Sequence, residues 1–537
     1  MRITATGHAG SYLETAAGSI LCDPWRSPAY FASWFPFPDN SGVEFESFAP
    51  DFLYVSHLHR DHFDRGLLRR LIKKSATVLL PEFPMEDLRT ELADLGFRSF
   101  VQTRSGEPVD LDGLRVMITT SVSPADGPLG DSTLSVDDGA VRLLNQNDAR
   151  PRDIDSILGF GPYDAHLLQF SGAIWWPVVY ELAEATKAAL GARKRLNGMA
   201  RAQRFIETVG ARFVFPNSGP ACFLDRDLFG LNDFSSGLVE DDKGADNPFP
   251  DQTVFLAYLA SNGIHNGRLL IPSSVAELSP AGCVVTHPMP ADAVERIFTH
   301  KRSYLEGYAA RQAGALEAER AARPSYDGDL LGALSEWWDP LLALADKIGP
   351  GVGDLVLLEL TGDAGVLERI VVDFVHRQVR LHAGEECRYR FVIARDLVEA
   401  QVARHEVDWV NSLFLSLRFR AARRGAYNEF IYTFFKCLSP ERLEFADGWY
   451  AEQDEPDDLV RIGDYMVQRR CPHLKADLAK FGELQDGVLE CGMHHWRFDL
   501  ATGRCLTSDA HKIVAYTVGS EPAPAPEPER EPGRLET

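Results

Sequence analysis

The chain has 537 residues, a net charge of −23 and 45% hydrophobic residues. This length exceeds what a single hydrophobic core supports, so we expect several domains. The acidic charge argues against binding to nucleic acid or to anionic membrane surfaces. No apolar run reaches the roughly 18 residues that a membrane span needs, and residues 1–5 predict a strand in place of a secretory segment.

The cysteines are spread widely along the sequence, and they show no spacing typical of a disulfide framework. Two of them belong to a metal-binding pattern near the C-terminus, and the others are expected to be buried, reduced thiols. Reduced thiols favour a reducing compartment. We therefore expect a cytoplasmic protein.

The N-terminal part of the chain predicts a series of strands. Apolar or alternating segments typical of strands occur at 1–5, 11–14, 19–22, 116–119, 132–137 and 141–144. A further buried strand at 52–55 is followed at once by the pattern His-x-His-x-Asp-His at 57–62, and a helical stretch follows at 65–74. The histidine cluster is therefore expected on a strand-to-helix loop.

This loop concentrates metal-binding side chains. His57 and His59 alternate and so point to one side of an extended segment, and Asp61 and His62 turn in from the loop. A chance polar loop is the alternative, but three histidines and an aspartate directly after a buried strand favour a metal site.

The pattern resembles the metal-binding motif of the metallo-β-lactamase fold. Residues 7–10 and 21–25 resemble the first loops of its lactonase-like branch, typified by L-ascorbate-6-phosphate lactonase. The resemblance implies an αβ/βα metallo-β-lactamase-like domain over residues 1–300. His8 is expected to hydrogen-bond the motif loop.

The other ligands of that family are matched only in part. Asp148 follows a strand where the family places an aspartate, but Asn217 stands where a last histidine is expected. The family's third histidine is missing before 132–137. His166 is expected to line the pocket and His287 to lie in a loop, and both remain weak candidates for the missing ligands.

The reduced ligand set argues against a dinuclear zinc hydrolase. His57, His59 and one carboxylate, either Asp148 or Asp61, suit a single iron with open positions, as in two-His-one-carboxylate oxygenases. His62 is then a further ligand or a proton relay.

A basic segment, Arg193–Arg195, lies within a helical run at 178–209. Charge runs on helices are usually solvated faces, and we expect this one to be solvated too. Contact with an anionic group is the alternative.

The middle of the chain changes pattern twice. Residues 301–345 predict a helical connector, and residues 346–455 predict strands followed by helices. Trp409, Leu413, Leu417 and residues 424–427 resemble a sterol-carrier-protein-like α+β domain. The resemblance implies a module for a hydrophobic ligand or a spacer, and we expect a spacer that places the last domain.

The C-terminal part, 456–518, carries two cysteine–histidine pairs, Cys471-x-His473 and Cys491-x-x-His494. Two thiolates and two imidazoles in mixed pairs are the ligand set of a Rieske 2Fe–2S cluster. A structural zinc site is the alternative, although zinc fingers usually pair like with like. Strand patterns around both pairs predict a small all-β domain, and the Pro- and Glu-rich residues 519–537 predict a disordered tail.

Residues 27–38, 144–148 and 169–177, together with the Rieske pattern, resemble the CMP-N-acetylneuraminate hydroxylase family. That family carries its Rieske part at the N-terminus, so the resemblance implies the type of reaction and not the sugar nucleotide. It implies a Rieske-type, O2-dependent monooxygenase, either a hydroxylase or an N-oxygenase, acting on a small polar or natural-product-like substrate. Electrons would pass from the 2Fe–2S cluster to a mononuclear non-heme Fe(II) at the histidine cluster.

No nicotinamide or flavin motif of the G-x-G-x-x-G type follows a strand, so we expect an external ferredoxin or reductase as electron donor. A lactonase-like hydrolase with a redox-sensing Rieske domain is the alternative, and a third is an electron-transfer protein with an inactive pocket. A homo-oligomer is compatible with the sequence but not required by it.

Overall fold

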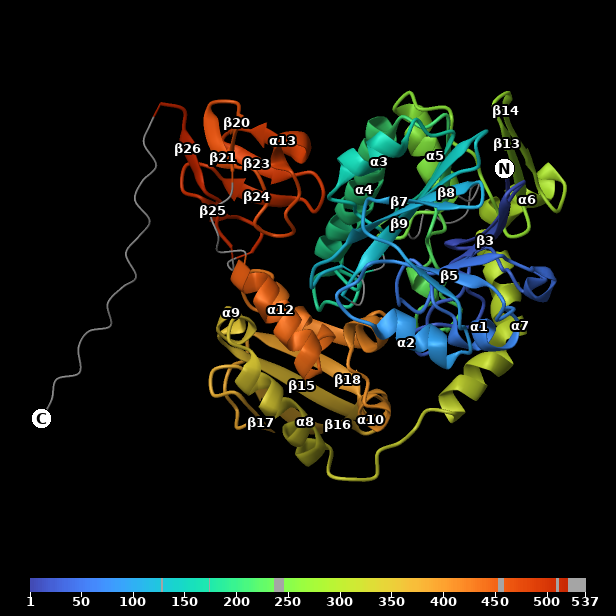
Figure 1. The fold of residues 1–537 in the computed structure, drawn as a ribbon. Helices are drawn as coiled ribbons and strands as arrows, with labels where there is room; N and C mark the ends of the chain where they lie inside the picture. The colour runs from blue at the N-terminus through green and yellow to red at the C-terminus, as the bar shows by residue number, and fades with distance from the viewer. Residues whose placement is uncertain (127–128, 173, 236–245, 453–457, 509–510, 520–537) are drawn as a thin grey trace, which may run out of the picture. The chain divides into compact units, whose positions relative to one another are not determined.

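The computed structural model describes residues 1–126, 129–172, 174–235, 246–452, 458–508 and 511–519 (Figure 1). They form two compact units. The first comprises Met1–Gly425 and Glu429–Glu452, and the second comprises Ala426–Asn428 and the described residues after 457. The predicted disordered tail lies, apart from its first residue, outside the described residues.

The N-terminal strands form a mixed sheet. In spatial order its strands are β14 (Gly282–Thr286), β13 (Val275–Ser279), β1 (Arg2–Gly7), β2 (Gly10–Thr15), β3 (Gly18–Cys22), β4 (Phe52–Tyr54), β5 (Thr77–Leu80) and β6 (Phe100–Gln102). The strands from β3 to β6 run parallel, with Tyr54 in register with Cys22 and Leu79. Helices α1 (Arg65–Arg70) and α2 (Asp87–Asp94) follow β4 and β5.

A second sheet faces the first. In spatial order it consists of β12 (Phe213–Asn217), β11 (Ala165–Gln169), β10 (Arg142–Asn147), β9 (Asp131–Asp137), β8 (Leu114–Ser121) and β7 (Pro108–Leu111). Helices α3 (Ile154–Phe160), α4 (Glu184–Val209) and α5 (Gln252–Ser261) contact this sheet. Because β10, β11 and β12 are parallel, their carboxyl ends meet at one edge.

Two apolar layers hold these elements together. Side chains from both sheets, such as Ile20 and Leu134, form the core between them. The opposite face of the first sheet packs on α1 and α2 through residues such as Leu53 and Leu67. The result is a metallo-β-lactamase-like αβ/βα sandwich, which confirms the predicted fold of the N-terminal part.

The chain then continues through helices to a five-stranded α+β domain in the first unit. The helices are α6 (Ala291–Thr299), α7 (Lys301–Ala321), α8 (Leu330–Leu344), α9 (Ile348–Val352), α10 (Arg395–Arg404), α11 (Glu429–Lys436) and α12 (Pro440–Glu452). The sheet order is β17 (Gln378–Leu381), β16 (Gly365–Asp373), β15 (Leu355–Gly362), β18 (Tyr389–Ala394) and β19 (Phe419–Arg423). Between α10 and β19 the chain forms a π-helical turn, Val410–Phe414.

The second unit is rich in short antiparallel strands. One of its sheets contains β20 (Leu459–Ile462), β21 (Tyr465–Gln468) and β26 (Ala515–Thr517). The other contains β22 (Gly482–Gln485), β23 (Val488–Cys491), β24 (Trp496–Asp499) and β25 (Arg504–Cys505), with the short helix α13 (Leu478–Phe481) before it. Within the described parts of the chain, no helix is long and apolar enough to cross a membrane.

Candidate metal centres

Aspartates fix both ends of the loop that follows β4. At its start, the backbone N–H and the hydroxyl of Ser56 donate to the two carboxylate oxygens of Asp23, at 2.7 Å each. At its end, Asp64 caps α1 by accepting a hydrogen bond from Leu67 N at 2.8 Å. The histidines between these anchors are thus held at the carboxyl edge of the first sheet.

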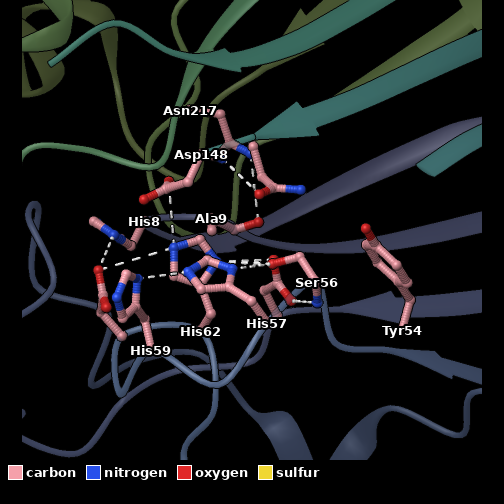
Figure 2. A network of polar contacts seen from close by, with 12 residues as sticks. His8, Ala9, Tyr54, Ser56, His57, His59, His62, Asp148 and Asn217 are labelled. Carbon is pink, nitrogen blue, oxygen red and sulfur yellow. Dashed lines mark hydrogen bonds and ion pairs between the residues drawn. The ribbon is translucent and has the colours of Figure 1, made fainter. Parts of the chain in front are cut away.

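His62 lies at the centre of the cluster that this loop carries (Figure 2). Its Nδ1 lies 3.0 Å from Asp23 Oδ2, and its Nε2 lies 3.3 Å from Asp148 Oδ1 and 3.9 Å from Asp61 Oδ2. Burial opposes the charged form of His62, but Asp148 and then Asp23 outweigh it and raise the pKa of His62 well above its usual value.

Two possible ligand atoms, one on His62 and one on Asp148, have no hydrogen-bond partner. His62 Nε2 and Asp148 Oδ1 are both buried and neither makes a hydrogen bond. Buried polar atoms are normally satisfied, so the pair fits a bound cation. Asp23 on the other ring nitrogen matches the carboxylate that usually orients a metal-bound imidazole.

His57 and His59 extend the cluster. His57 Nδ1 is 3.2 Å from Asp131 Oδ1, and its Nε2 is 2.7 Å from His59 Nδ1. Such a separation suits two nitrogens that share a proton or bind one metal. Burial, followed by the charge of His57, lowers the pKa of His59 well below its usual value. His59 is therefore neutral at physiological pH, which is the form that binds metals.

Two overlapping sets of possible ligands are present among the described residues. One consists of His57, His62 and Asp148, and the other of His8, Asp61 and His62, with the ligand atoms of each set within 4.8 Å of one another. Because Asp23 engages His62 Nδ1, only Nε2 is available, and one nitrogen binds one metal. The sets therefore compete for a single metal position.

The two carboxylates differ in what they already bind. Asp61 accepts a hydrogen bond from the Tyr30 hydroxyl at 2.6 Å on Oδ1, and its Oδ2 lies 2.9 Å from His8 Nε2. Asp148 retains the oxygen that faces His62. The geometry thus favours Asp148 as the carboxylate ligand and Asp61 as a partner that orients His8, the role expected for His8 in the motif loop.

The weaker histidine candidates lie outside both ligand sets. His166 is buried with its Nε2 2.8 Å from Gln146 Oε1, and burial lowers its pKa to about 3. His287 Nδ1 lies 2.8 Å from the Ser274 hydroxyl. Asn217 ends β12 and donates to Ala9 O at 3.4 Å, so it ties the second sheet to the loop after β1.

The middle domain contacts the loop that bears the histidines. Asn411, in the π-helical turn, donates to Leu58 O at 3.1 Å, and Arg60 pairs with Glu406 at 2.6 Å. The buried Lys436 lies close enough to lower the pKa of His59 further. This domain thus contacts the histidine loop within the first unit. The sequence predicted a spacer for the last domain and did not predict this contact.

A small pocket opens beside His8 and Asp61. Other side chains that line it include Trp34, Ser171 and Phe223. The aromatic residues of the segment 34–37 have different surroundings. Trp34 lines the pocket, whereas Phe35 and Phe37 pack in a buried apolar cluster.

The basic segment of α4 differs from its prediction. Arg193 is exposed, but Arg195 is buried in an ion pair with Asp233 at 2.8 Å, and Lys194 is half-buried. The expectation of a fully solvated face is therefore wrong, because Arg195 pairs with Asp233 and donates to Ser235, which is the contact with an anionic group that the sequence left as the alternative.

The two cysteine–histidine pairs lie on turns of the second unit. Cys471 follows β21 and its carbonyl accepts from Lys475 N at 2.8 Å, whereas Cys491 ends β23 and its carbonyl accepts from His495 N at 2.7 Å. Each turn brings its histidine back beside its cysteine.

The structure brings these four predicted ligands together. The rings of His473 and His494 have centroids 5.0 Å apart, and both thiols are buried. Burial, followed by the neighbouring Cys491, raises the pKa of Cys471 well above its usual value. A thiolate forms here only if a cation compensates for the buried charge, which the irons of a Rieske cluster do. The donor set therefore fits that cluster.

Two family models match the chain. The Rieske [2Fe-2S] domain matches residues 461–517, and the Rv3818-like, SCP2-like domain matches residues 330–452. The chain thus carries an SCP2-like domain followed by a C-terminal Rieske domain, behind a metallo-β-lactamase-like domain. The SCP2-like match begins with α8, for which the sequence predicts a connector.

Three known proteins illustrate the similarities. A protein of Mycolicibacterium smegmatis, named as a Rieske 2Fe-2S iron-sulfur protein, is 47% identical over 526 residues, which cover 96% of this chain and 99% of the relative. Aminopyrrolnitrin oxygenase PrnD of Pseudomonas fluorescens is 35% identical over 63 residues, which cover 12% of this chain and 17% of PrnD. The solved structure of CmlA, a diiron β-hydroxylase from Streptomyces venezuelae, has 15% identity and a TM-score of 0.32 and covers 52% of this chain and 54% of CmlA.

Proposed function

Since the chain belongs to the family of the mycobacterial Rieske 2Fe-2S iron-sulfur proteins, we propose that it is a Rieske-type, O2-dependent monooxygenase. Its substrate would be a small polar or natural-product-like molecule that is hydroxylated or N-oxygenated. The observation that carries the proposal is the presence, in one chain, of a Rieske ligand set and a separate buried histidine–carboxylate cluster with unengaged ligand atoms. The local likeness to an oxygenase, PrnD, agrees with it.

Two separate sets of residues would bind the metals. Cys471, His473, Cys491 and His494 hold the 2Fe–2S cluster, which carries single electrons. His57, His62 and Asp148 would hold a mononuclear non-heme iron. The sequence predicted His59 in place of His62, and His59 lies beside this set as a possible further ligand. An iron with open positions supplies the activation of dioxygen, which amino-acid side chains do not provide.

The chain's own residues prepare that site. Asp23 and Asp131 orient His62 and His57 through their Nδ1 atoms, so both rings turn Nε2 inward. The lowered pKa of His59 keeps its ring neutral, so a ring nitrogen is available as a metal ligand. The apolar and aromatic side chains around the pocket, such as Trp34 and Phe223, limit the entry of water.

The electron donor is proposed to be an external ferredoxin or reductase, because the sequence shows no nicotinamide or flavin motif. This assigns the Rieske domain the task of receiving electrons one at a time. A soluble chain in the cytoplasm would meet such donors directly.

The test is dioxygen uptake by anaerobically reconstituted, full-length protein supplied with a reduced ferredoxin and its reductase. We expect uptake above that of the ferredoxin system alone. Cleavage of lactones or esters without dioxygen uptake would instead favour the lactonase-like hydrolase with a redox-sensing Rieske domain.

A further inference from the structure

Arg150, Lys194 and Arg201 carry charges that act on one another, and Arg150 and Arg201 also interact with Asp148. Arg150 follows β10 on the same loop as Asp148, whereas Lys194 and Arg201 lie seven residues apart on α4. Seven residues are about two helical turns, so Lys194 and Arg201 share one face of the helix. Arg201 is only 8% exposed, and Arg150 and Lys194 are half-buried.

Gly198 docks that face of α4 at the edge of the second sheet. A β-carbon at this position would lie 3.1 Å from Phe170 O, directly after β11. The absence of a side chain thus lets the helix approach the carboxyl ends of β11 and its parallel neighbour β10. Lys194 and Arg201 flank this contact, and Arg150 comes to the same edge from β10.

The three positive charges lie close enough to affect one another. Burial, followed by the charges of Arg150 and Arg201, lowers the pKa of Lys194 to about 7. Arg150 likewise lowers the pKa of Arg201, after the larger effect of burial. Three like charges held together in a partly buried space repel one another unless an anion lies between them.

The carboxylates nearest to Arg150 and Arg201 each lie close to another side chain as well. Asp126 pairs with Arg152 at 2.7 Å, Asp131 lies 3.2 Å from His57, and Asp148 lies 3.3 Å from His62. Within the described parts of the chain, the side chains of Arg150, Lys194 and Arg201 form no hydrogen bond or ion pair. Asp126, Asp131 and Asp148 offset part of the charge of Arg150, and Asp148 also acts on Arg201, but none of these three carboxylates pairs directly with the three cations.

We propose that Arg150, Lys194 and Arg201 form an oxyanion site that holds a carboxylate or phosphate group of a small molecule next to the metal centre. Guanidinium groups bind both kinds of oxyanion through paired hydrogen bonds, and the ammonium group adds a point charge. That the anion belongs to the substrate rests on the proposed function. The site then selects acidic substrates and fixes the distance from their anionic group to the reacting atom.

The test is equilibrium dialysis of cluster-loaded, full-length protein against labelled inorganic phosphate and, separately, labelled acetate. We expect saturable binding of at least one of these anions by the wild type. Lys194→Gln and Arg201→Gln should each weaken it by about 10-fold or more, because each removes a charge-assisted contact. Arg150→Gln, on another segment, should do the same. The matched control is Arg193→Gln on the exposed side of α4, which should bind like the wild type.

Absence of binding in the wild type, or equal weakening in Arg193→Gln and Arg201→Gln, would overturn the site. Each variant is compared only if its circular dichroism and its Rieske absorption match those of the wild type. Because dialysis needs no turnover, it tests the oxyanion site independently of the proposed monooxygenase activity. Anion binding without dioxygen uptake rejects the monooxygenase and keeps the site, and dioxygen uptake without anion binding does the reverse.

Discussion

Replacing Cys491 by serine is expected to abolish both the Rieske EPR signal and dioxygen uptake. Cys491 is fully buried at the end of β23, and a serine hydroxyl does not replace a thiolate on iron at neutral pH. Even changes outside the ligand shell cost metal sites about 10–100-fold, so loss of a ligand should lower uptake by more than ~100-fold. EPR of the reduced protein and an oxygen electrode measure the two effects.

The matched control for this variant is Cys505→Ser. Cys505 is buried in the same sheet, and its sulfur accepts a hydrogen bond from Ser508 N, which a serine oxygen can also accept. We expect this variant to keep the cluster signal. A Cys491→Ser protein with an intact Rieske signal would show that the assigned ligands are wrong.

Replacing His62 by alanine is expected to leave the Rieske signal unchanged and to remove the metal of the first unit together with turnover. His62 is shared by both ligand sets, and no other ring nitrogen of the described residues lies in both. Loss of the groups that orient a metal ligand already costs about 10–100-fold, so loss of the ligand itself should lower dioxygen uptake by more than ~100-fold. The measurement is metal content together with uptake on the same preparation.

Two further variants serve as controls for His62→Ala. His287→Ala removes a histidine that hydrogen-bonds Ser274 and lies outside both ligand sets, and it should behave like the wild type. Asp61→Asn keeps the shape of the residue that binds Tyr30 and His8, and it should retain the metal if Asp148 is the carboxylate ligand. Full uptake in His62→Ala would contradict the placement of the metal.

Local sequence predicts the elements of this protein better than it predicts their surroundings. The buried strand before His57 and the alternating pattern of β9 are local signals, so the αβ/βα sandwich follows from them. Mixed cysteine–histidine pairs are equally local, which is why the Rieske domain is found from spacing alone. Asp148 is found because it directly follows a strand.

The partners that hold the ligands come from distant segments. Asp23, Asp131 and Tyr30 orient His62, His57 and Asp61, yet each lies tens of residues from its partner in the chain. Spacing contains no information on such hydrogen bonds, although Asp23 lies in a loop that already resembles the lactonase-like branch.

The exposure of Lys194 shows the same limit for a helix. A basic run on a helix is usually solvated, but here Gly198 lets the helix approach Phe170 after β11 and Gly191 lets it approach Asp246, so this face is turned inward. Likewise, the hydrogen bond from Asn411 to Leu58 joins residues from two domains, and the sequence around neither residue predicts it.

The metal content of full-length protein, reconstituted anaerobically with iron and sulfide and then desalted in the presence of zinc, distinguishes an oxygen-activating iron site from a hydrolytic zinc site. We expect about three irons per chain, two in the cluster and one at the histidine–carboxylate site, and negligible zinc. About two irons and one zinc per chain, in protein that cleaves esters without consuming dioxygen, would contradict this expectation.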